Sequence, residues 1–305
     1  MDRLAKMFGA VETGTFLGLP AAPVGAVGAG CAIIGADRAT PYETAGAYCA
    51  GGAAAIRRGS LASSGIAGHV NFDLGRAGAP DAADCGDVAT VGEPETDRGA
   101  IREAVRTIRA QGASVVLLGG DDSVQIPMLE ALEGPLHVVQ IDAHIDWRDE
   151  VSGERLGLSS TQRRASEMDQ VTGITLVGQR GIGSARASDL RDAQEWGATL
   201  VSAREVARSG VARAVESVPE GASVVVCLDL DGLDPAVVPS VIAPTPGGLS
   251  YWDVVELIEG IAGRAEIVAL GMVEFMPDAD VGGVGAVNAA HLLTTLLGVM
   301  APGRG

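Results

Sequence analysis

The chain has 305 residues, a formal net charge of −17 and 43 glycines, and 47% of its residues are hydrophobic while only 3% are aromatic. This composition excludes a disordered chain and is sufficient for a full hydrophobic core in one large α/β domain or two ordinary ones. Because only 22 basic residues stand against 39 acidic ones, the chain lacks the basic face that a nucleic acid or an anionic membrane requires. We therefore expect neither as a partner.

The cysteines and the N-terminus favour a cytoplasmic location. The four cysteines form no CxxC pair, and Cys31 and Cys227 lie in apolar runs where cysteine acts as a small hydrophobic residue. The first residues do not read as a secretion signal, and no run of about 18 uninterrupted apolar residues occurs.

The first third of the chain alternates short regular elements with irregular segments. Residues 1–30 are rich in Gly, Ala and Pro and are expected to form an arm or edge that packs on neighbours. A strand is predicted over 31–35 and a helix from near 47 to 58. The stretch 77–97 is expected to be a surface excursion, and the apolar spacing in 101–111 predicts a further helix.

From residue 114 onward, apolar strands alternate with helices. The predicted strands are 114–118, 136–142, 174–178, 223–229 and 266–272, and the predicted helices are 162–168, 186–195, 251–261 and 284–300. This alternation predicts an α/β fold, a three-layer α/β/α arrangement with a central parallel sheet. Since neither an internal repeat nor a linker is evident, 1–305 is predicted to be a single domain.

Acidic residues follow several of these strands. The segment Gln140–Asp146 ends a strand, and its period of two would point Asp142, His144 and Asp146 towards one face. Two further strands run into Asp229 and Asp231 and into the Gly119–Ser123 segment. Parallel α/β sheets build their sites at the carboxyl ends of the strands, so these residues predict a polynuclear metal centre. Carboxylates with one imidazole favour Mn²⁺ or Mg²⁺, and Mn²⁺ tolerates the histidine better.

Three motifs give the chain a recognisable signature. Gly-Gly-Asp-Asp-Ser at 119–123, Asp-Ala-His-Ile-Asp at 142–146 and Asp-Leu-Asp-Gly-Leu-Asp-Pro at 229–235 resemble those of the arginase/agmatinase ureohydrolases, most closely the agmatinase-like branch. The segments 239–248 and 272–277 are also similar to that family.

The resemblance implies a hydrolase with two Mn²⁺ ions per chain. One ion would be held by Asp122, Asp142, Asp146 and Asp229, and the other by Asp142, His144, Asp229 and Asp231. Asp146 would also hold the hydroxide shared by the ions, and Glu274 would accept hydrogen bonds from the guanidinium of a small substrate such as agmatine or a guanidino acid. The products would be urea and an amine, and the protein would be a homo-oligomer, a trimer or a hexamer.

Two positions depart from the family pattern. Asp122 and Leu158 stand where the family has histidines, and the second of these is thought to assist substrate binding or to protonate the departing amine. Two alternatives therefore stay open: hydrolysis of another amidine, such as a formimino compound, and a metal-binding homologue with impaired catalysis.

Overall fold

A central parallel sheet organises the chain in the computed structural model, which describes residues 6–10, 14–183 and 185–301. The sheet has eight strands in the order β4-β1-β5-β10-β9-β6-β7-β8, and every neighbouring pair is parallel. The strands are β1 (Cys31–Gly35), β4 (Ala82–Asp87), β5 (Ser114–Leu118), β6 (Leu136–Ile141), β7 (Val171–Val177), β8 (Thr199–Val201), β9 (Ser223–Asp229) and β10 (Glu266–Val273).

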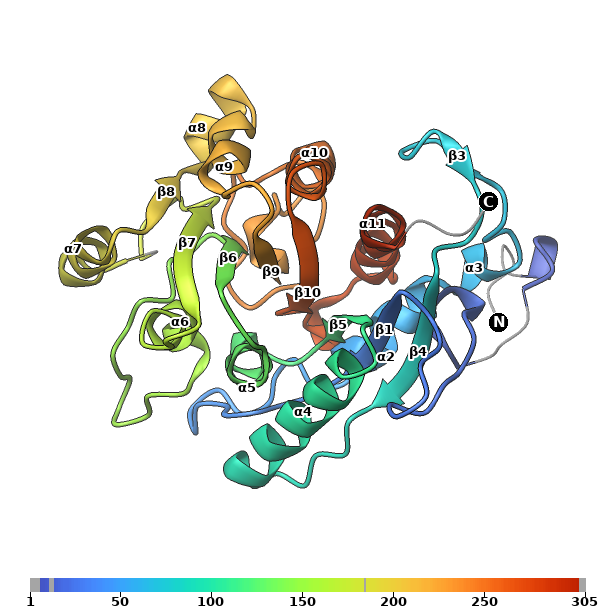
Figure 1. Ribbon diagram of the computed structural model, residues 1–305, viewed down its shortest axis with the longest axis horizontal. Coiled ribbons are helices and arrows are strands. Elements are labelled where there is room, and N and C mark those ends of the chain that lie inside the picture. The colour runs from blue at the N-terminus through green and yellow to red at the C-terminus, as the bar shows by residue number, and fades with distance from the viewer. Residues whose placement is uncertain (1–5, 11–13, 184, 302–305) are drawn as a thin grey trace.

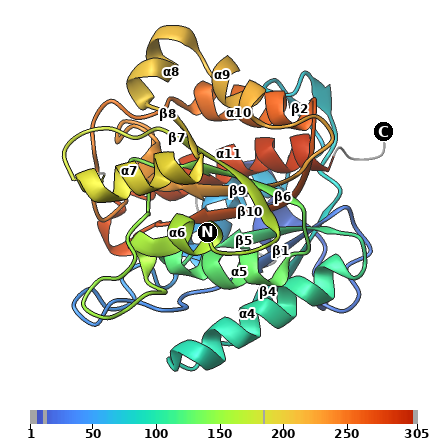
Figure 2. The same ribbon diagram turned by 60° about the vertical axis from the view of Figure 1, so that its left-hand side comes forward.

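Helices cover both faces of this sheet, as Figures 1 and 2 show. One face packs against helices α2 (Gly52–Gly59), α8 (Ala203–Ser209), α9 (Ala212–Ser217), α10 (Tyr251–Ala262) and α11 (Val284–Met300). The other packs against α4 (Pro94–Arg109), α5 (Gln125–Ala131), α6 (Thr161–Ala165) and α7 (Ala187–Trp196). The predicted three-layer α/β/α fold is confirmed.

Strand alternation explains the two hydrophobic layers. In β5, Val116 and Leu118 pack with the first group of helices while Val115 and Leu117 pack with the second. Successive side chains of a strand point to opposite faces, and a sheet covered on both faces therefore requires the continuous apolar runs seen in the sequence.

Short elements complete the chain. They are the helices α3 (Leu61–Ser64), η1 (Phe16–Gly18), η2 (Asp122–Val124), η3 (Leu158–Ser160), η4 (Leu230–Gly232) and η5 (Pro277–Ala279), and a separate antiparallel pair, β2 (Val70–Asn71) with β3 (Arg76–Ala77). No helix in the described ranges is long and apolar enough to cross a membrane.

Two expectations for the first third of the chain were wrong. The stretch 77–97 contains the edge strand β4 and the start of α4. The helix expected from near residue 47 begins at Gly52, after a series of turns. Within 1–30, of which 1–5 and 11–13 lie outside the described residues, Phe16 and Leu17 are buried in the chain's own core.

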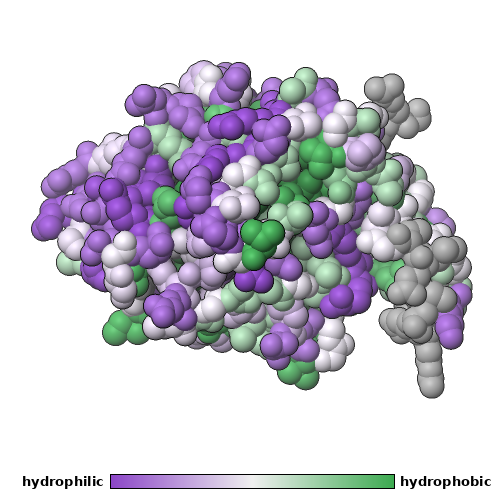
Figure 3. Space-filling model, turned by 90° about the horizontal axis from the view of Figure 1, so that it is seen from below, coloured by the Kyte–Doolittle hydropathy of each residue, from purple (hydrophilic) through white to green (hydrophobic). Residues whose placement is uncertain are grey.

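The outer surface is mostly polar on the face viewed in Figure 3. Hydrophilic residues dominate it, and hydrophobic ones appear there in separate small groups. The large apolar side chains are mainly inside, as the parallel sheet requires.

Candidate metal centre

The acidic motifs meet because their strands are neighbours. β5, β10, β9 and β6 are consecutive in the sheet and run in the same direction. The loops that follow them therefore open at one edge, the usual place for a site in such a sheet. A cavity of about 150 Å³ lies there, and its wall includes Asp122, His144, Asp146, Asp229, Asp231 and Glu274. The cavity is large enough for a small molecule only.

Glycines allow the loop after β5 to turn sharply into the site. Gly119 and Gly120 have φ angles of 82° and 71°, a region that side chains with a Cβ rarely adopt. A Cβ on Gly119 would also lie 2.6 Å from the backbone nitrogen of Ala53. Asp121 and Asp122 follow this turn. The Asp121 carboxylate caps η2 by accepting a hydrogen bond from Ser123 N at 3.1 Å, and Asp122 faces the cavity.

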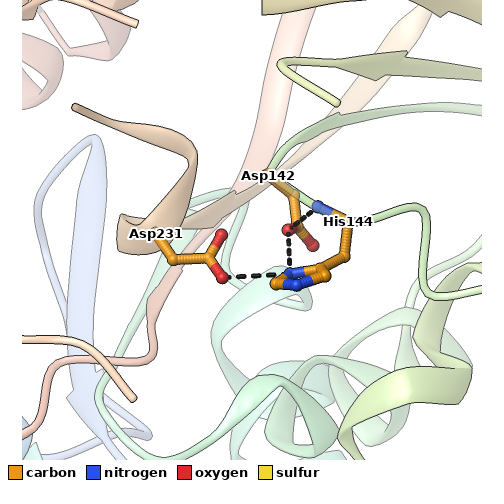
Figure 4. A group of neighbouring side chains, drawn as sticks. All are labelled: Asp142, His144 and Asp231. Atoms are coloured by element: carbon orange, nitrogen blue, oxygen red, sulfur yellow. Dashed lines mark hydrogen bonds and ion pairs between the residues drawn. The ribbon is translucent and has the colours of Figure 1, made fainter. Parts of the chain in front are cut away.

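Asp142, His144 and Asp231 form the tightest cluster (Figure 4). The Nδ1 atom of His144 lies 3.2 Å from Asp142 Oδ1 and 3.0 Å from Asp231 Oδ2. One potential ligand atom from each of the three residues lies within 4.8 Å of the others. The cluster joins the end of β6 to η4, so it links two of the three acidic motifs.

The remaining acids are held in the same region by buried hydrogen bonds. Gln140 Nε2 donates to Asp142 Oδ2 at 2.6 Å and to Asp146 Oδ2 at 3.0 Å. Asp229 Oδ1 accepts from the backbone nitrogen of Asp231 at 2.7 Å. The acids that face this region are at most 8% exposed: Asp121, Asp122, Asp142, Asp146, Asp229 and Asp231.

Crowding of carboxylates perturbs their protonation. Burial, followed by repulsion from Asp142, raises the pKa of Asp122 to about 8 and that of Asp231 to about 6. Burial and neighbouring acids likewise raise the pKa values of Asp146 and Asp229 well above the usual range.

His144 behaves in the opposite way to an ordinary buried histidine. Burial disfavours its charged form, but hydrogen bonds and attraction from Asp142 and Asp231 outweigh that effect and raise the pKa of His144 to about 10. Contacts with His144 in turn lower the pKa of Asp142 in spite of its burial. The cluster thus strongly favours positive charge.

This donor set fits divalent metal ions. Asp122 Oδ2 is buried and has no hydrogen-bond partner in the described part of the chain. A buried carboxylate oxygen without a partner is costly unless a cation binds it. Carboxylate oxygens with one imidazole suit a hard cation such as Mn²⁺.

Glu274 forms the wall beside these acids. It directly follows β10 and accepts from the Tyr48 hydroxyl at 2.9 Å (Oε1) and 2.7 Å (Oε2), and from the backbone nitrogen of Asp122 at 2.8 Å. Burial, then repulsion from Asp121, raises the pKa of Glu274 well above the usual value.

Two of the site residues have strained backbones. Asp146 has a φ of 43° and Glu274 a φ of 66°, although neither is glycine. Such conformations cost on the order of 1–3 kcal/mol each and concentrate at functional sites. The fold therefore holds both carboxylates in orientations that an unconstrained chain would avoid.

The sequence did not single out several residues that position the site. Tyr48 and Gln125 contact Glu274 and Asp122, respectively, and only tertiary packing reveals these contacts. Gln140 could have been predicted from the sequence. It is a polar residue in a buried strand, and because it lies two positions before Asp142 it shares the same face of the strand.

Arg180 was also not predicted as a site residue, since it lies in a loop that is far from the acidic motifs in the sequence. Its guanidinium donates to backbone carbonyls that surround the loop after β9, those of Asp231 (2.6 Å), Leu233 (3.0 Å), Gly232 (3.2 Å), Thr245 (2.7 Å) and Gly178 (3.2 Å).

Comparison with known proteins gives this site a context. A family model described as the arginase family matches residues 29–298. The chain is 32% identical over 267 residues to the N(1)-aminopropylagmatine ureohydrolase of Thermococcus kodakarensis, covering 86% of this chain and 88% of that protein. It is 33% identical over 257 residues to a formimidoylglutamase of Halobacterium salinarum, covering 81% and 80%.

A solved structure shares the whole fold. The proclavaminate amidino hydrolase of Streptomyces clavuligerus superposes with a TM-score of 0.81 at 26% identity, covering 95% of this chain and 98% of that one. The sheet, the strand-end acids and the extent of these matches agree: the chain belongs to the arginase family, a family of metal-dependent hydrolases.

Proposed function

We propose that this chain is a binuclear manganese hydrolase that cleaves a guanidino compound to urea and an amine. The observation that carries the proposal is the set of buried carboxylates, with one imidazole, that three strand ends bring to a single small cavity beside Glu274. Bound cations would neutralise the carboxylates that share this buried region, which supports the proposal.

The ligands divide into two overlapping sets in this proposal. Asp122 and Asp146 would hold one ion, His144 and Asp231 would hold the other, and Asp142 and Asp229 would contribute to both. The contact of His144 with Asp142 and Asp231 supports the second set. The unpartnered oxygen of Asp122 supports the first.

The chain's own groups then orient the reaction. Bound divalent ions would lower the pKa of a coordinated water and so supply a nucleophile at neutral pH. Asp146 would accept a hydrogen bond from the attacking water and would orient it towards the substrate's central carbon. Gln140 holds Asp146 for this role.

Glu274 binds the reacting end of the substrate. On the side that faces the cavity, its carboxylate would accept from N–H groups of a planar guanidinium. The Tyr48 hydroxyl bonds to both oxygens and fixes the plane of the carboxylate. Glu274 would therefore place the guanidinium carbon in front of Asp146.

One observation favours a second candidate function. Leu158 lines the cavity where the sequence resemblance leads one to expect a histidine, and leucine cannot protonate a departing amine. A formimino substrate is the alternative, consistent with the similarity to a formimidoylglutamase.

We further propose a homo-oligomer, a trimer or a hexamer, located in the cytoplasm. The location is supported by the cysteines, since Cys31, Cys49, Cys85 and Cys227 are all free thiols.

The test is product release by the Mn²⁺-loaded protein from agmatine, arginine, several guanidino acids and a formimino acid. Urea and formamide are measured separately, with Asp146→Asn as the control. Urea that disappears in the control supports the proposal. Formamide instead of urea would select the alternative, and neither product from a chain with two bound ions would indicate a homologue with impaired catalysis.

A further inference from the structure

Arg148 is a cation in the wall of the cavity that holds the candidate ligands. It lies two residues after Asp146 and is half-buried, and its backbone nitrogen donates to Ser159 O at 3.0 Å. That bond ties the loop after β6 to η3. Arg148 therefore belongs to an anchored part of the wall.

The neighbouring arginines are all paired with carboxylates. Arg164 contacts Asp149 at 2.8 Å, Arg155 contacts Asp149 at 3.2 Å, and Arg163 contacts Glu167 at 3.0 Å. The acid next to Arg148 in sequence is thus already shared by two other guanidinium groups.

Arg148 has no such partner. Within the described residues, no carboxylate forms an ion pair with its guanidinium. The chain has 39 acidic and 22 basic residues, so acids to pair with it are plentiful. A half-buried guanidinium is always charged and presents a planar array of donors that fits a carboxylate. The donors of Arg148 are therefore available to a ligand in the cavity.

One acidic group in the wall would instead favour a ligand whose far end is positively charged. Asp189, near the start of α7, could attract a cationic substrate tail. Its carboxylate is 7% exposed, however, and already accepts from Arg186 N at 3.2 Å and from Ser188 Oγ at 3.3 Å. Among the residues that the structure describes, Arg148 is the charged side chain of the wall, apart from the acid cluster, that has no hydrogen-bond or ion-pair partner.

We propose that Arg148 binds a carboxylate at the far end of the substrate, so that the substrate is an amidino acid rather than a diamine derivative such as agmatine. The proposal rests on the proposed function for the reacting end. Leu158 and Ile242, also in the wall, are suited to contact the methylene groups between the two charged ends. A local cation also offsets the repulsion of an anionic substrate by a chain of net charge −17.

The experiment compares 4-guanidinobutanoate with agmatine, which have similar lengths and opposite tail charges. The kcat/KM for amine release is measured with the Mn²⁺-loaded chain, with Arg148→Gln, and with Arg155→Gln as a matched control. Arg155 is paired with Asp149 and is not part of the cavity wall. We expect Arg148→Gln to reduce kcat/KM for the acid roughly 10- to 100-fold, mainly through KM. Agmatine turnover should change less than about twofold, and the control should change neither.

A binding measurement separates this proposal from the proposed function. In an Asp146→Asn background, calorimetry should show a dissociation constant for 4-guanidinobutanoate that rises roughly 10- to 100-fold with Arg148→Gln. Equal binding with and without Arg148 would overturn the role of Arg148, as would a preference for agmatine that Asp189→Asn abolishes. If 4-guanidinobutanoate still binds in a way that depends on Arg148 but no amine is released by the chain with Asp146, only the proposed function would be contradicted.

Discussion

Buried glutamines hold the carboxylates of the candidate metal centre. Gln125 Nε2 donates to Asp122 Oδ1, and Gln140 donates to Asp142 and Asp146. Both glutamines are fully buried. Groups that hold metal ligands by hydrogen bonds fix the ligand orientation and tune metal affinity.

Replacing Gln125 should therefore weaken metal binding. Gln125→Leu removes the donor that holds Asp122, and we expect the affinity for Mn²⁺ to fall about 10- to 100-fold. Gln162→Leu is the matched control, because Gln162 is equally buried but its side chain makes no hydrogen bond to these acids; its backbone bond to the Asp146 carbonyl is kept in the variant. Calorimetric titration with Mn²⁺ measures both. Equal losses in the two variants would show that Gln125 acts through packing alone.

The sequence predicted the acids of the site better than the residues that support them. Asp142, His144 and Asp231 could be anticipated because a strand's period of two and the parallel order of the sheet bring strand ends together. Tyr48 could not, since its contact with Glu274 joins positions 226 residues apart. No local pattern encodes such a contact.

At the level of elements, Arg180 connects the loop after β7 to the loop after β9. It binds the carbonyls of Asp231 and Leu233, and so supports the backbone of a candidate ligand. Hydrogen bonds to a charged group contribute about 1.5–3 kcal/mol each when well made.

Arg180→Met should loosen this connection. We expect a fall of several degrees in Tm and a weaker affinity for Mn²⁺, because the loop carrying Asp231 loses its donor. The Tm and the Mn²⁺ affinity of Arg180→Lys should lie between those of Arg180→Met and those of the unmutated chain, since an ammonium can reach fewer of the carbonyls. Scanning calorimetry measures the three Tm values, and a lower Tm for Arg180→Lys than for Arg180→Met would refute this role of Arg180.

The two edge strands that the sequence failed to predict have a weak hydrophobic signal. β4 reads Ala-Ala-Asp-Cys-Gly-Asp, which contains no β-branched or aromatic residue, and it forms an edge of the sheet. The three-residue β8 forms the opposite edge. Central strands such as β5 and β9 were predictable because burial on both faces requires continuous apolar runs.

At the level of the whole molecule, the acid cluster should make the metal-free chain less stable as the pH rises. The folded-state pKa values of Asp122 (about 8) and His144 (about 10) exceed their ordinary ones, so the native state binds more protons than the unfolded state above neutral pH. Stability then falls with rising pH. His137, whose pKa burial lowers to about 4, acts in the opposite direction only below about pH 6.5.

We therefore expect the Tm of the EDTA-treated chain to drop between about pH 7 and pH 8.5. Mn²⁺ should remove this drop, because a bound ion displaces the extra protons. Calorimetric scans with EDTA and with Mn²⁺ make the comparison. A metal-free Tm that is constant or rises over this interval would be incompatible with the cluster described above.

The most direct test of a binuclear site is the number of Mn²⁺ ions bound per chain, measured by equilibrium dialysis and metal analysis. We expect two ions for the unmutated chain, one for Asp122→Asn, and none for Asp229→Asn, since Asp229 is proposed to bind both. Fewer than two ions in the original chain, or two retained in Asp122→Asn, would contradict it.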